Sequence, residues 1–374
     1  MRKAVVIAML FLCFCLCIGA DTTEDYRSEA YVLMETETKT VIEEKNADKR
    51  LNAGYLSKLM GILLVAERII SGELSTDDVL TASDSVKNTK GAVIWLEQGD
   101  KMSVEELLKS VIIGNANDAM TVLAEKVSGD VKNFVMDMNA RAFDLGLRNT
   151  RFVSPYGYYS PEEYTTAHDV AVISSELAGY DFLTDYFSTW RDFVKDGKVE
   201  LVNENAMSRN YSMHIGFKAC HSAESGYCIV EGGRNDSGST FVAVSLGGDS
   251  EESSYSTAKS LLKKGFRNYK VMLTMFPDEM LLPLNVMNGT ENAVEIRIKS
   301  QGIVAVPKNG GELRTRVVIP GYITAPVNIG QPIGSAAFYS GDTLVYEAPI
   351  VAAKAVPALS FKFVLKSMLL KLLE

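Results

Sequence analysis

The spacing of apolar residues changes along this chain of 374 residues, and the order of the changes restricts the fold more than any other sequence feature. Residues 26–50 alternate between apolar and polar side chains, which predicts two strands joined by a polar turn. Helical spacing then recurs over residues 56–71, 103–113, 117–128, 131–145 and 168–179. Strand patterns at 213–221, 227–231 and 240–246 precede a last helical pattern at 252–266. Helices followed by a mainly antiparallel sheet and a closing helix predict an α+β domain over residues 21–272.

From about residue 275 the helical spacing gives way to short β-type runs. Turn dipeptides such as Asn309-Gly310 and Ser340-Gly341 separate them. The runs occupy residues 293–298, 303–306, 313–319, 333–338 and 343–351. This pattern predicts a small all-β domain, a β-sandwich, over residues 273–353.

The beginning of the chain has the pattern of a secretory signal. Arg2 and Lys3 precede an apolar run over residues 4–18, and Gly19 and Ala20 offer a cleavage site of small residues. The run is shorter than the roughly 20 residues that a spanning helix needs. We therefore expect a signal peptide over residues 1–20 and an exported protein; an uncleaved anchor is the alternative.

The end of the chain combines many apolar residues with lysines. Residues 354–374 include three phenylalanine or methionine side chains and several leucines, together with Lys362, Lys366 and Lys371. The segment is too short to span a bilayer. It suits an amphipathic helix lying in a membrane interface, with lysines facing anionic headgroups. A helix packed on the β domain is the alternative.

Charge and potential ligand residues exclude several function classes. The net charge of −9 and the lack of a basic cluster before the C-terminus argue against nucleic-acid binding. The three histidines show no ligand spacing with acidic partners, and only Cys220 and Cys228 remain after residue 20. Neither a catalytic metal nor another cofactor is expected.

Short stretches in a particular order connect the chain to a known family. They lie at residues 58–67, 117–125, 138–139, 145–146, 149–152, 154–157, 225–228 and 258–266. Together, at this spacing, they resemble the serine-type D-alanyl-D-alanine carboxypeptidases, which are low-molecular-mass penicillin-binding proteins that share a serine–lysine mechanism with class A β-lactamases. The resemblance covers nearly the whole chain after residue 20. It implies a β-lactamase/transpeptidase-like domain that acts on peptidoglycan stem peptides.

The first family motif, Ser-x-x-Lys, aligns with residues 55–58, where Lys58 is retained but Tyr55 stands at the nucleophile position. In the family the lysine amine takes the proton of the serine hydroxyl one helical turn away. The Tyr55 phenol lies at the end of a rigid ring and would overshoot the place of a short hydroxyl. Ser57 is next to Lys58, and adjacent helical residues do not face each other. Neither side chain is a convincing replacement.

The second motif, Ser-x-Asn, aligns with residues 115–117. Asn115 stands at the position of the proton-relaying serine, whereas Asn117 is retained and could orient a lysine or a substrate amide. Removing one member of a hydrolase's nucleophile–base unit lowers kcat by up to about 10⁶-fold. A changed nucleophile together with a changed relay therefore predicts an inactive site.

The third motif, Lys-Thr-Gly, aligns with Lys218, Ala219 and Cys220, followed by His221. The hydroxyl that would hold a substrate carboxylate is missing, and a side chain replaces the glycine that lets a substrate backbone lie close. The resemblance also places Ser254 where some members carry a carboxylate-binding arginine. Lys58 and Lys218 could each still contact a ligand. Alternatively, both have purely structural roles, and Lys218 caps its strand in solvent.

The two remaining cysteines flank a predicted turn. If the strands around His221 and Tyr227 form a hairpin that turns near Glu224, Cys220 and Cys228 lie directly opposite each other. Exported proteins meet oxidising conditions, so a disulfide between them is a hypothesis. Two free, half-buried thiols are the alternative.

Three hypotheses for the function remain open. The favoured one is an inactive homologue on the outer face of the cytoplasmic membrane that binds peptidoglycan peptide or an envelope protein. The second is an active carboxypeptidase with an unforeseen nucleophile. The third is a structural envelope module with a vestigial cleft.

Overall fold

A five-stranded antiparallel sheet forms the middle layer of the first domain in the computed structural model, which describes residues 26–52 and 54–371. Across the sheet the strands are β2 (Val41–Lys45), β1 (Ala30–Glu35), β9 (Thr240–Gly248), β8 (Gly226–Arg234) and β7 (His214–Ser222). The predicted strand pair of residues 26–50 is confirmed as β1 and β2. Because β1 pairs with β9, the start of the domain is joined to its end.

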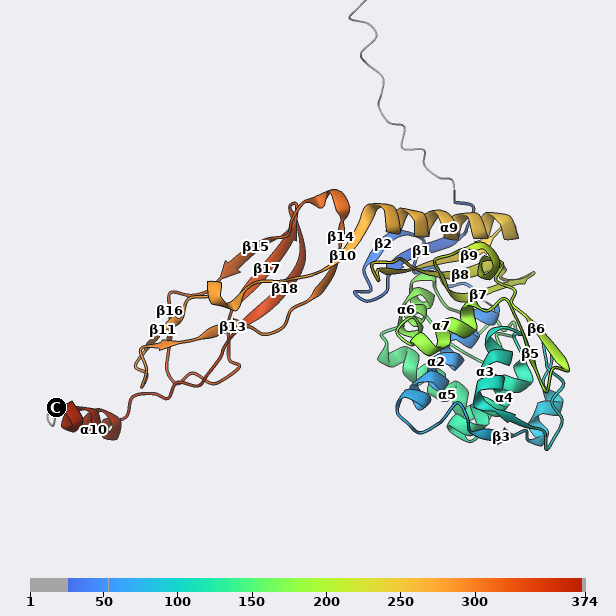
Figure 1. Ribbon diagram of the computed structural model, residues 1–374, viewed down its shortest axis with the longest axis horizontal. Helices are drawn as coiled ribbons and strands as arrows, with labels where there is room; N and C mark the ends of the chain where they lie inside the picture. Colours follow the sequence, from blue (N-terminus) through green and yellow to red (C-terminus); the bar gives the residue numbers. More distant parts are fainter. Residues whose placement is uncertain (1–25, 53, 372–374) are drawn as a thin grey trace, which may run out of the picture.

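Helices cover both faces of this sheet (Figure 1). One face packs on α9 (Glu251–Asn268), and the other faces a helical group. That group contains α2 (Lys58–Ile70), α3 (Val104–Ile112), α4 (Asn117–Ser128), α5 (Val131–Asp144), α6 (Ala167–Leu177) and α7 (Asp181–Ser188). Helix α2 lies at the centre of the core, with residues 58–66 all buried. The predicted α+β class is confirmed.

Short elements complete the first domain, and the sequence patterns did not predict them. They are η1 (Gly54–Ser57), β3 (Val79–Thr81), η2 (Asp84–Asn88), β4 (Lys101–Ser103), β5 (Arg191–Val194), β6 (Val199–Val202) and α8 (Met207–Asn210). Each spans three to five residues, too few to establish a periodicity. The predicted signal peptide of residues 1–20 lies outside the described part of the chain.

The second domain consists of short strands around its own core, which confirms the predicted all-β domain. It follows β10 (Tyr269–Leu273), which pairs with β14 (Ile303–Pro307). One sheet contains β11 (Leu284–Met287), β12 (Ala293–Val294) and β16 (Tyr322–Thr324); the other contains β13 (Ile296–Ile298), β15 (Arg314–Val318), β17 (Pro332–Ser340) and β18 (Thr343–Ala352). Residues of both sheets, among them Val286 and Phe338, share one buried cluster. Bridges at Val356 and Ala358 extend this domain beyond residue 353.

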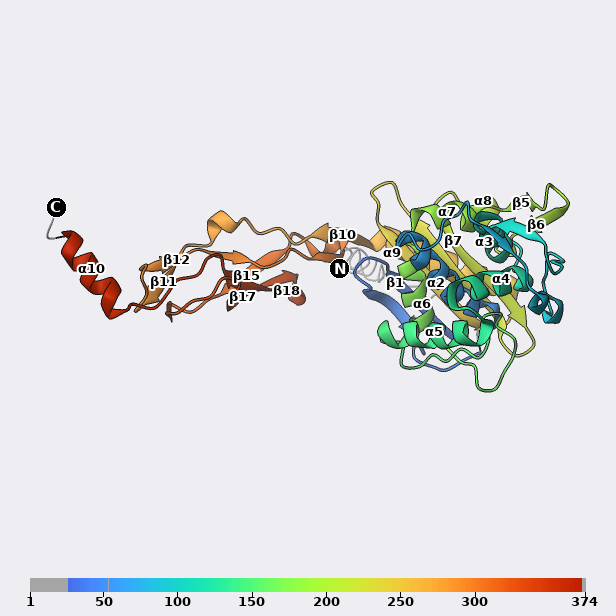
Figure 2. The same cartoon turned by 90° about the horizontal axis from the view of Figure 1, so that it is seen from below.

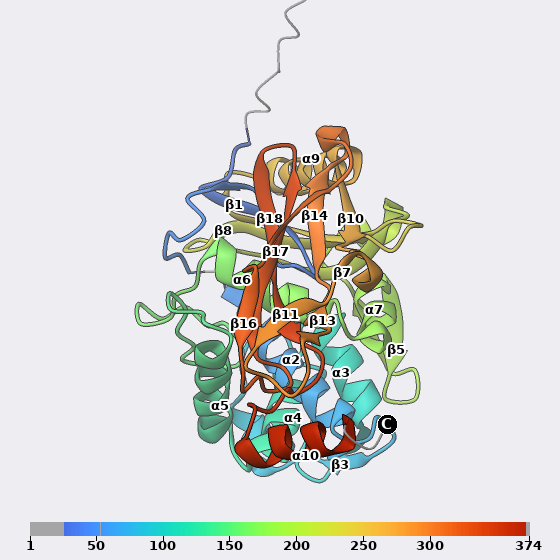
Figure 3. The same ribbon diagram turned by 90° about the vertical axis from the view of Figure 1, so that its left-hand side faces the viewer.

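The two domains lie end to end, and α10 (Phe361–Lys371) follows at the far end of the β domain (Figures 1 and 2). Viewed along the long axis, α10 is nearest the viewer and the first domain lies behind (Figure 3). The helix starts at Phe361, later than residue 354, because the preceding segment bridges to the β domain. The apolar side chains of Phe361, Leu365 and Met368 on this helix are exposed, so the alternative of a helix packed on the β domain is wrong. None of the helices in the described residues is long and apolar enough to cross a bilayer.

Candidate functional site

The three motif segments meet where the start of α2 approaches the edge strand β7. Tyr55 and Lys58 come from η1 and α2, Asn115 and Asn117 from the connection between α3 and α4, and residues 218–221 from β7. Strand β7 packs against η1, and the ammonium of Lys218 is close enough to lower the pKa of Lys58. The structure therefore brings together the segments that the motifs predicted.

Lys58 is fully buried, and its amine is already bonded within the protein. Its Nζ donates to the carbonyl oxygen of Tyr156 at 2.9 Å and lies 4.5 Å from the centre of the Tyr55 ring. Burial, and then the charge of Lys218, hold the pKa of Lys58 well below its usual range. A lowered pKa brings a lysine closer to the neutral form that a general base requires. Within the described residues, however, no hydroxyl or thiol is hydrogen-bonded to it.

Neither candidate hydroxyl is placed to replace the missing serine. The Ser57 hydroxyl lies 2.7 Å from Oε1 of Glu163 and 3.1 Å from the carbonyl oxygen of Gly54, so it is engaged elsewhere. Burial, and then the negative charge of Glu204, raise the pKa of the Tyr55 phenol. A phenol with a raised pKa is protonated at neutral pH and is therefore a poor nucleophile.

The two asparagines of the second motif do not hold Lys58. Nδ2 of Asn117 donates to the carbonyl oxygen of Lys90 at 2.7 Å and lies 3.3 Å from the Tyr158 hydroxyl. Asn115 has a φ of 55°, which an asparagine tolerates better than most residues. The side-chain carbonyl oxygens of both asparagines are buried without a hydrogen-bond partner in the described part of the chain.

Lys218 is turned inward, away from a ligand. Its Nζ donates to the carbonyl oxygens of Val111 at 3.1 Å and Ile112 at 2.8 Å, in the last turn of α3. Only 3% of the residue is exposed, and burial lowers the pKa of Lys218 to about 8. The alternative that Lys218 caps its strand in solvent is wrong. A cation at the C-terminal carbonyls of a helix satisfies groups that the helix leaves unpaired, so Lys218 ties the sheet edge to α3.

Cys220 fills the space where the family motif has glycine. Hydrogen bonding with Cys228, and then burial, raise the pKa of the Cys220 thiol well above its usual value, while the backbone N–H groups of Tyr55 and Leu56 act in the opposite direction. In acyl-transfer enzymes the N–H of the nucleophile residue commonly helps to bind the developing oxyanion. In this protein the corresponding N–H, that of Tyr55, faces the Cys220 sulfur. His221, next in β7, stacks on Tyr227 with ring centres 4.0 Å apart.

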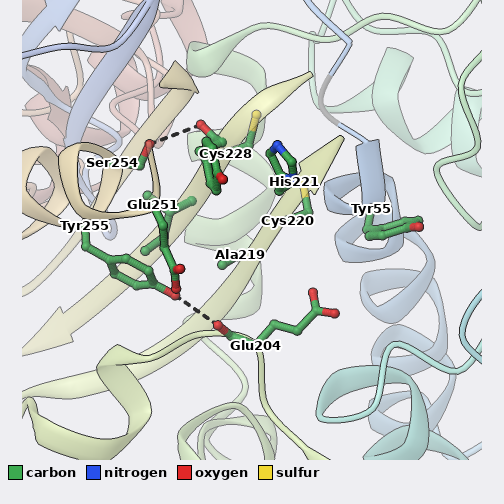
Figure 4. Close-up of a pocket in the computed structure, with 11 residues that line it drawn as sticks. Tyr55, Glu204, Ala219, Cys220, His221, Cys228, Glu251, Ser254 and Tyr255 are labelled. Atoms are coloured by element: carbon green, nitrogen blue, oxygen red, sulfur yellow. Dashed lines mark hydrogen bonds between the residues drawn. The ribbon is translucent and has the colours of Figure 1, made fainter. Parts of the chain in front are cut away.

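A cavity of about 420 Å³ opens beside β7 and the start of α9 (Figure 4). Tyr55 and Tyr255 lie on opposite sides, and the side chains of Glu204 and Glu251 face the space between them. Ser254 also lines the cavity, but its hydroxyl donates to the Tyr227 carbonyl oxygen at 3.2 Å. No lysine or arginine is among the described residues that line the cavity. The site is acidic and aromatic.

Several residues of the cleft were missed by the sequence analysis. Glu204 lies in an irregular segment before α8, and Glu251 and Tyr255 are in the first turns of α9. No motif or periodicity connects these three residues to the start of α2. A second cavity of about 190 Å³ shares Tyr55, Cys220 and His221 with the first. The described residues contain no group of three or more side chains suited to a metal.

An antiparallel sheet between α9 and a helical group, with one lysine at the start of the central helix and one on the edge strand, defines the class of serine–lysine acyl-transfer proteins. The chain belongs to the D-alanyl-D-alanine carboxypeptidase family, whose family model matches residues 19–250. A second family model, described as the C-terminal domain of penicillin-binding protein 5, matches residues 274–358.

Individual relatives extend the similarity over both domains. The chain is 28% identical to the D-alanyl-D-alanine carboxypeptidase DacF of Bacillus subtilis over 355 residues, which are 93% of this chain and 91% of the relative. It is 26% identical to DacC of Escherichia coli over 363 residues, 93% and 90% of the two chains. The structure of penicillin-binding protein 5 from Haemophilus influenzae superposes with a TM-score of 0.81 at 24% identity, covering 90% of this chain and 99% of that one. This last likeness concerns the fold alone.

Proposed function

We propose that this protein is a catalytically inactive D-alanyl-D-alanine carboxypeptidase homologue of the cell envelope that binds peptidoglycan peptide or a protein partner. One observation carries the proposal: the Lys58 amine bonds to the Tyr156 carbonyl oxygen and lies against the Tyr55 ring, with no nucleophile hydrogen-bonded to it among the described residues. Loss of the nucleophile–base unit lowers kcat by about 10⁶-fold in a serine hydrolase. The changes at Asn115 and Cys220 add to that loss.

The residues that line the larger cavity favour a ligand that presents an amine over one that presents a C-terminal carboxylate. A peptide that ends in D-alanine presents a carboxylate, which Glu204 and Glu251 would repel. The same two carboxylates attract an ammonium group, and tyrosine rings favour cations near their faces. A stem peptide or partner segment that presents an amine is therefore a better ligand for this cleft than one that presents its C-terminal carboxylate.

Labelling with a fluorescent penicillin tests the absence of a nucleophile, since labelling requires acylation. We expect no labelled band under conditions that label DacF of Bacillus subtilis. A band that survives denaturation would refute inactivity and support the second hypothesis, an active enzyme with an unforeseen nucleophile. Peptide mapping of that band would then identify the nucleophile.

Calorimetry tests ligand binding independently. A lysine-containing stem peptide with a free side-chain amine should bind, and its acetylated form should bind more weakly. The double variant Glu204→Gln/Glu251→Gln should lose this preference. Glu252→Gln is the matched control because Glu252 lies on the same turn of α9 but outside the cavity. If neither peptide bound, the structural-module hypothesis with a vestigial cleft would replace the binding proposal.

We also propose that the protein is exported and lies on the outer face of the cytoplasmic membrane through α10. The exposed Phe361, Leu365 and Met368, together with Lys362 and Lys366, support interfacial binding. Sedimentation with vesicles should deplete the full chain from solution, more strongly when the vesicles contain anionic lipid. Deletion of residues 359–374 should abolish this depletion. Equal sedimentation of both proteins would contradict an anchoring role.

A further inference from the structure

The hairpin of β7 and β8 places its two cysteines face to face. Cys220 and Cys228 are directly opposed in the antiparallel register, as the turn near Glu224 predicted. Directly opposed residues have Cα atoms roughly 4.5–5.5 Å apart, within the range of about 4.4–6.8 Å that a disulfide spans. Both side chains are buried, and no disulfide joins them in the structure. The backbone is therefore already arranged for a covalent link.

The side chains of the two cysteines also influence each other electrostatically. Hydrogen bonding with Cys220 holds the pKa of Cys228 below its usual value, and hydrogen bonding with Cys228 holds the pKa of Cys220 well above its usual value. The Cys228 thiol in turn lies 3.3 Å from the Ser225 carbonyl oxygen and donates to it. Thiol exchange proceeds through the thiolate, so Cys228 is the better attacking group.

We propose that Cys220 and Cys228 are a redox modification site that forms a reversible disulfide in the wall of the cleft. The oxidant is a disulfide, either of a protein or of glutathione. The Cys228 thiolate attacks one sulfur of that disulfide, forms a mixed disulfide and releases one thiolate. The Cys220 thiolate then attacks the Cys228 sulfur and releases the second thiolate. The pair loses two electrons and two protons, and the external disulfide is reduced to two thiols.

The link reaches the cleft through Cys220. Its sulfur lies next to Gly54 at the start of η1, where the backbone N–H groups of Tyr55 and Leu56 act to lower the pKa of the thiol, and the residue lines both cavities. Oxidation bonds this sulfur to Cys228 in β8 and makes it a weaker hydrogen-bond acceptor. The interaction between β7 and the start of α2 therefore becomes weaker. The redox state of the pair therefore changes the wall of the cavity that Tyr55 and Cys220 line. This effect does not depend on the binding of a peptide.

Differential alkylation of the native full chain, followed by peptide mapping, tests the link. After incubation with oxidised glutathione, we expect a linked peptide pair two hydrogens lighter than the free peptides and a loss of alkylation at both cysteines. Dithiothreitol should reverse both changes. Because the thiols are buried, a parallel sample is refolded in a glutathione redox buffer, where access does not limit the reaction. Full alkylation of both cysteines in both samples would overturn the proposal.

Two variants make the test specific. Cys220→Ser and Cys228→Ser should each remove the linked peptide. The variant Cys228→Ser/Ile229→Cys keeps two thiols but moves one to the opposite face of β8, and should form no link to Cys220. Hydrogen exchange tests the effect on the cleft: the amides of Tyr55 and Leu56 should exchange faster in the oxidised protein. Equal exchange in both states would refute the coupling between the disulfide and the start of α2. Whether the disulfide forms is decided separately, by the presence or absence of the linked peptide.

Discussion

Replacing Lys218 with methionine should remove a pH dependence of stability that the buried ammonium creates. The lysine pKa is 10.5 in an unfolded chain and about 8 in the folded protein. This difference corresponds to about 3 kcal/mol. The unfolded chain binds more protons between these two pH values, so the free energy of unfolding rises with pH in that window. Below pH 8 both states carry the proton, and the full penalty is present.

The expected size follows from linkage. Between about pH 7 and pH 9.5, the free energy of unfolding of the wild-type protein should rise by about 2 kcal/mol through Lys218 alone. The Lys218→Met variant should lack this rise. Because the Lys218 charge also lowers the pKa of Lys58, the variant should lose a part of the contribution of Lys58 too. At neutral pH the free energy of unfolding should change little, because two effects oppose each other. The variant no longer carries the penalty of the buried ammonium, but the carbonyl oxygens of Val111 and Ile112 lose their donor, which costs about 1–3 kcal/mol each.

Urea denaturation at several pH values, followed by circular dichroism, measures these free energies. The informative quantity is the difference between variant and wild type, because the titrations of most other groups cancel in it. Lys132→Met, which removes an exposed lysine on α5, is the control and should follow the wild-type slope. If the Lys218→Met curve ran parallel to the wild-type curve across this range, the reasoning on the buried ammonium would be refuted.

Three further substitutions test the packing, each by denaturation. Phe338→Ala should destabilise the β domain by about 3–5 kcal/mol, because the ring is fully buried; an unchanged midpoint for that domain would contradict its core. Gly157→Ala should lower the unfolding temperature, because the residue has a φ of 76° and an added Cβ would lie 2.1 Å from the Gly54 carbonyl oxygen. Ser103→Ala should cost about 1 kcal/mol through loss of the α3 capping box; Ser71→Ala, whose hydroxyl caps no N-terminus, is the control.

Long amphipathic elements were predictable because their periodicity repeats over several turns. Helix α4 matches the predicted residues 117–128 at both ends, and α2 lies within the predicted 56–71. The register of β7 and β8 was also predictable, because a tight turn near Glu224 leaves one pairing that keeps the apolar residues on their faces. Elements such as β5 and α7 were missed because they are short and their burial is decided by distant segments.

The site was predictable only where a motif marks it. The positions of Tyr55, Lys58 and Lys218 followed from motif spacing, but the direction of a lysine side chain did not. Lys218 turns inward because the last carbonyl groups of α3 need donors, and that need exists only once β7 packs beside α3. The acidic lining has the same origin. Glu204 and Glu251 come from segments that only the fold brings together.

These contacts show why the nucleophile alone should not restore the chemistry. In Tyr55→Ser the Lys58 amine would still be bonded to the Tyr156 carbonyl oxygen, Asn115 would still lack a relay hydroxyl, and the Cys220 sulfur would still occupy the N–H of residue 55. We therefore expect no penicillin labelling of Tyr55→Ser.

The variant Y55S/N115S/A219T/C220G restores all three motifs, and it should be labelled if the rest of the cleft is intact. Removing the Tyr55 ring also exposes the Lys58 amine to the new hydroxyl, which is the contact that proton transfer requires. Labelling of the single variant would contradict the view that Asn115 and Cys220 block the site. An unlabelled but folded quadruple variant would place the remaining obstacle in Glu204 and Glu251, because an acidic cavity repels the carboxylate that penicillin carries.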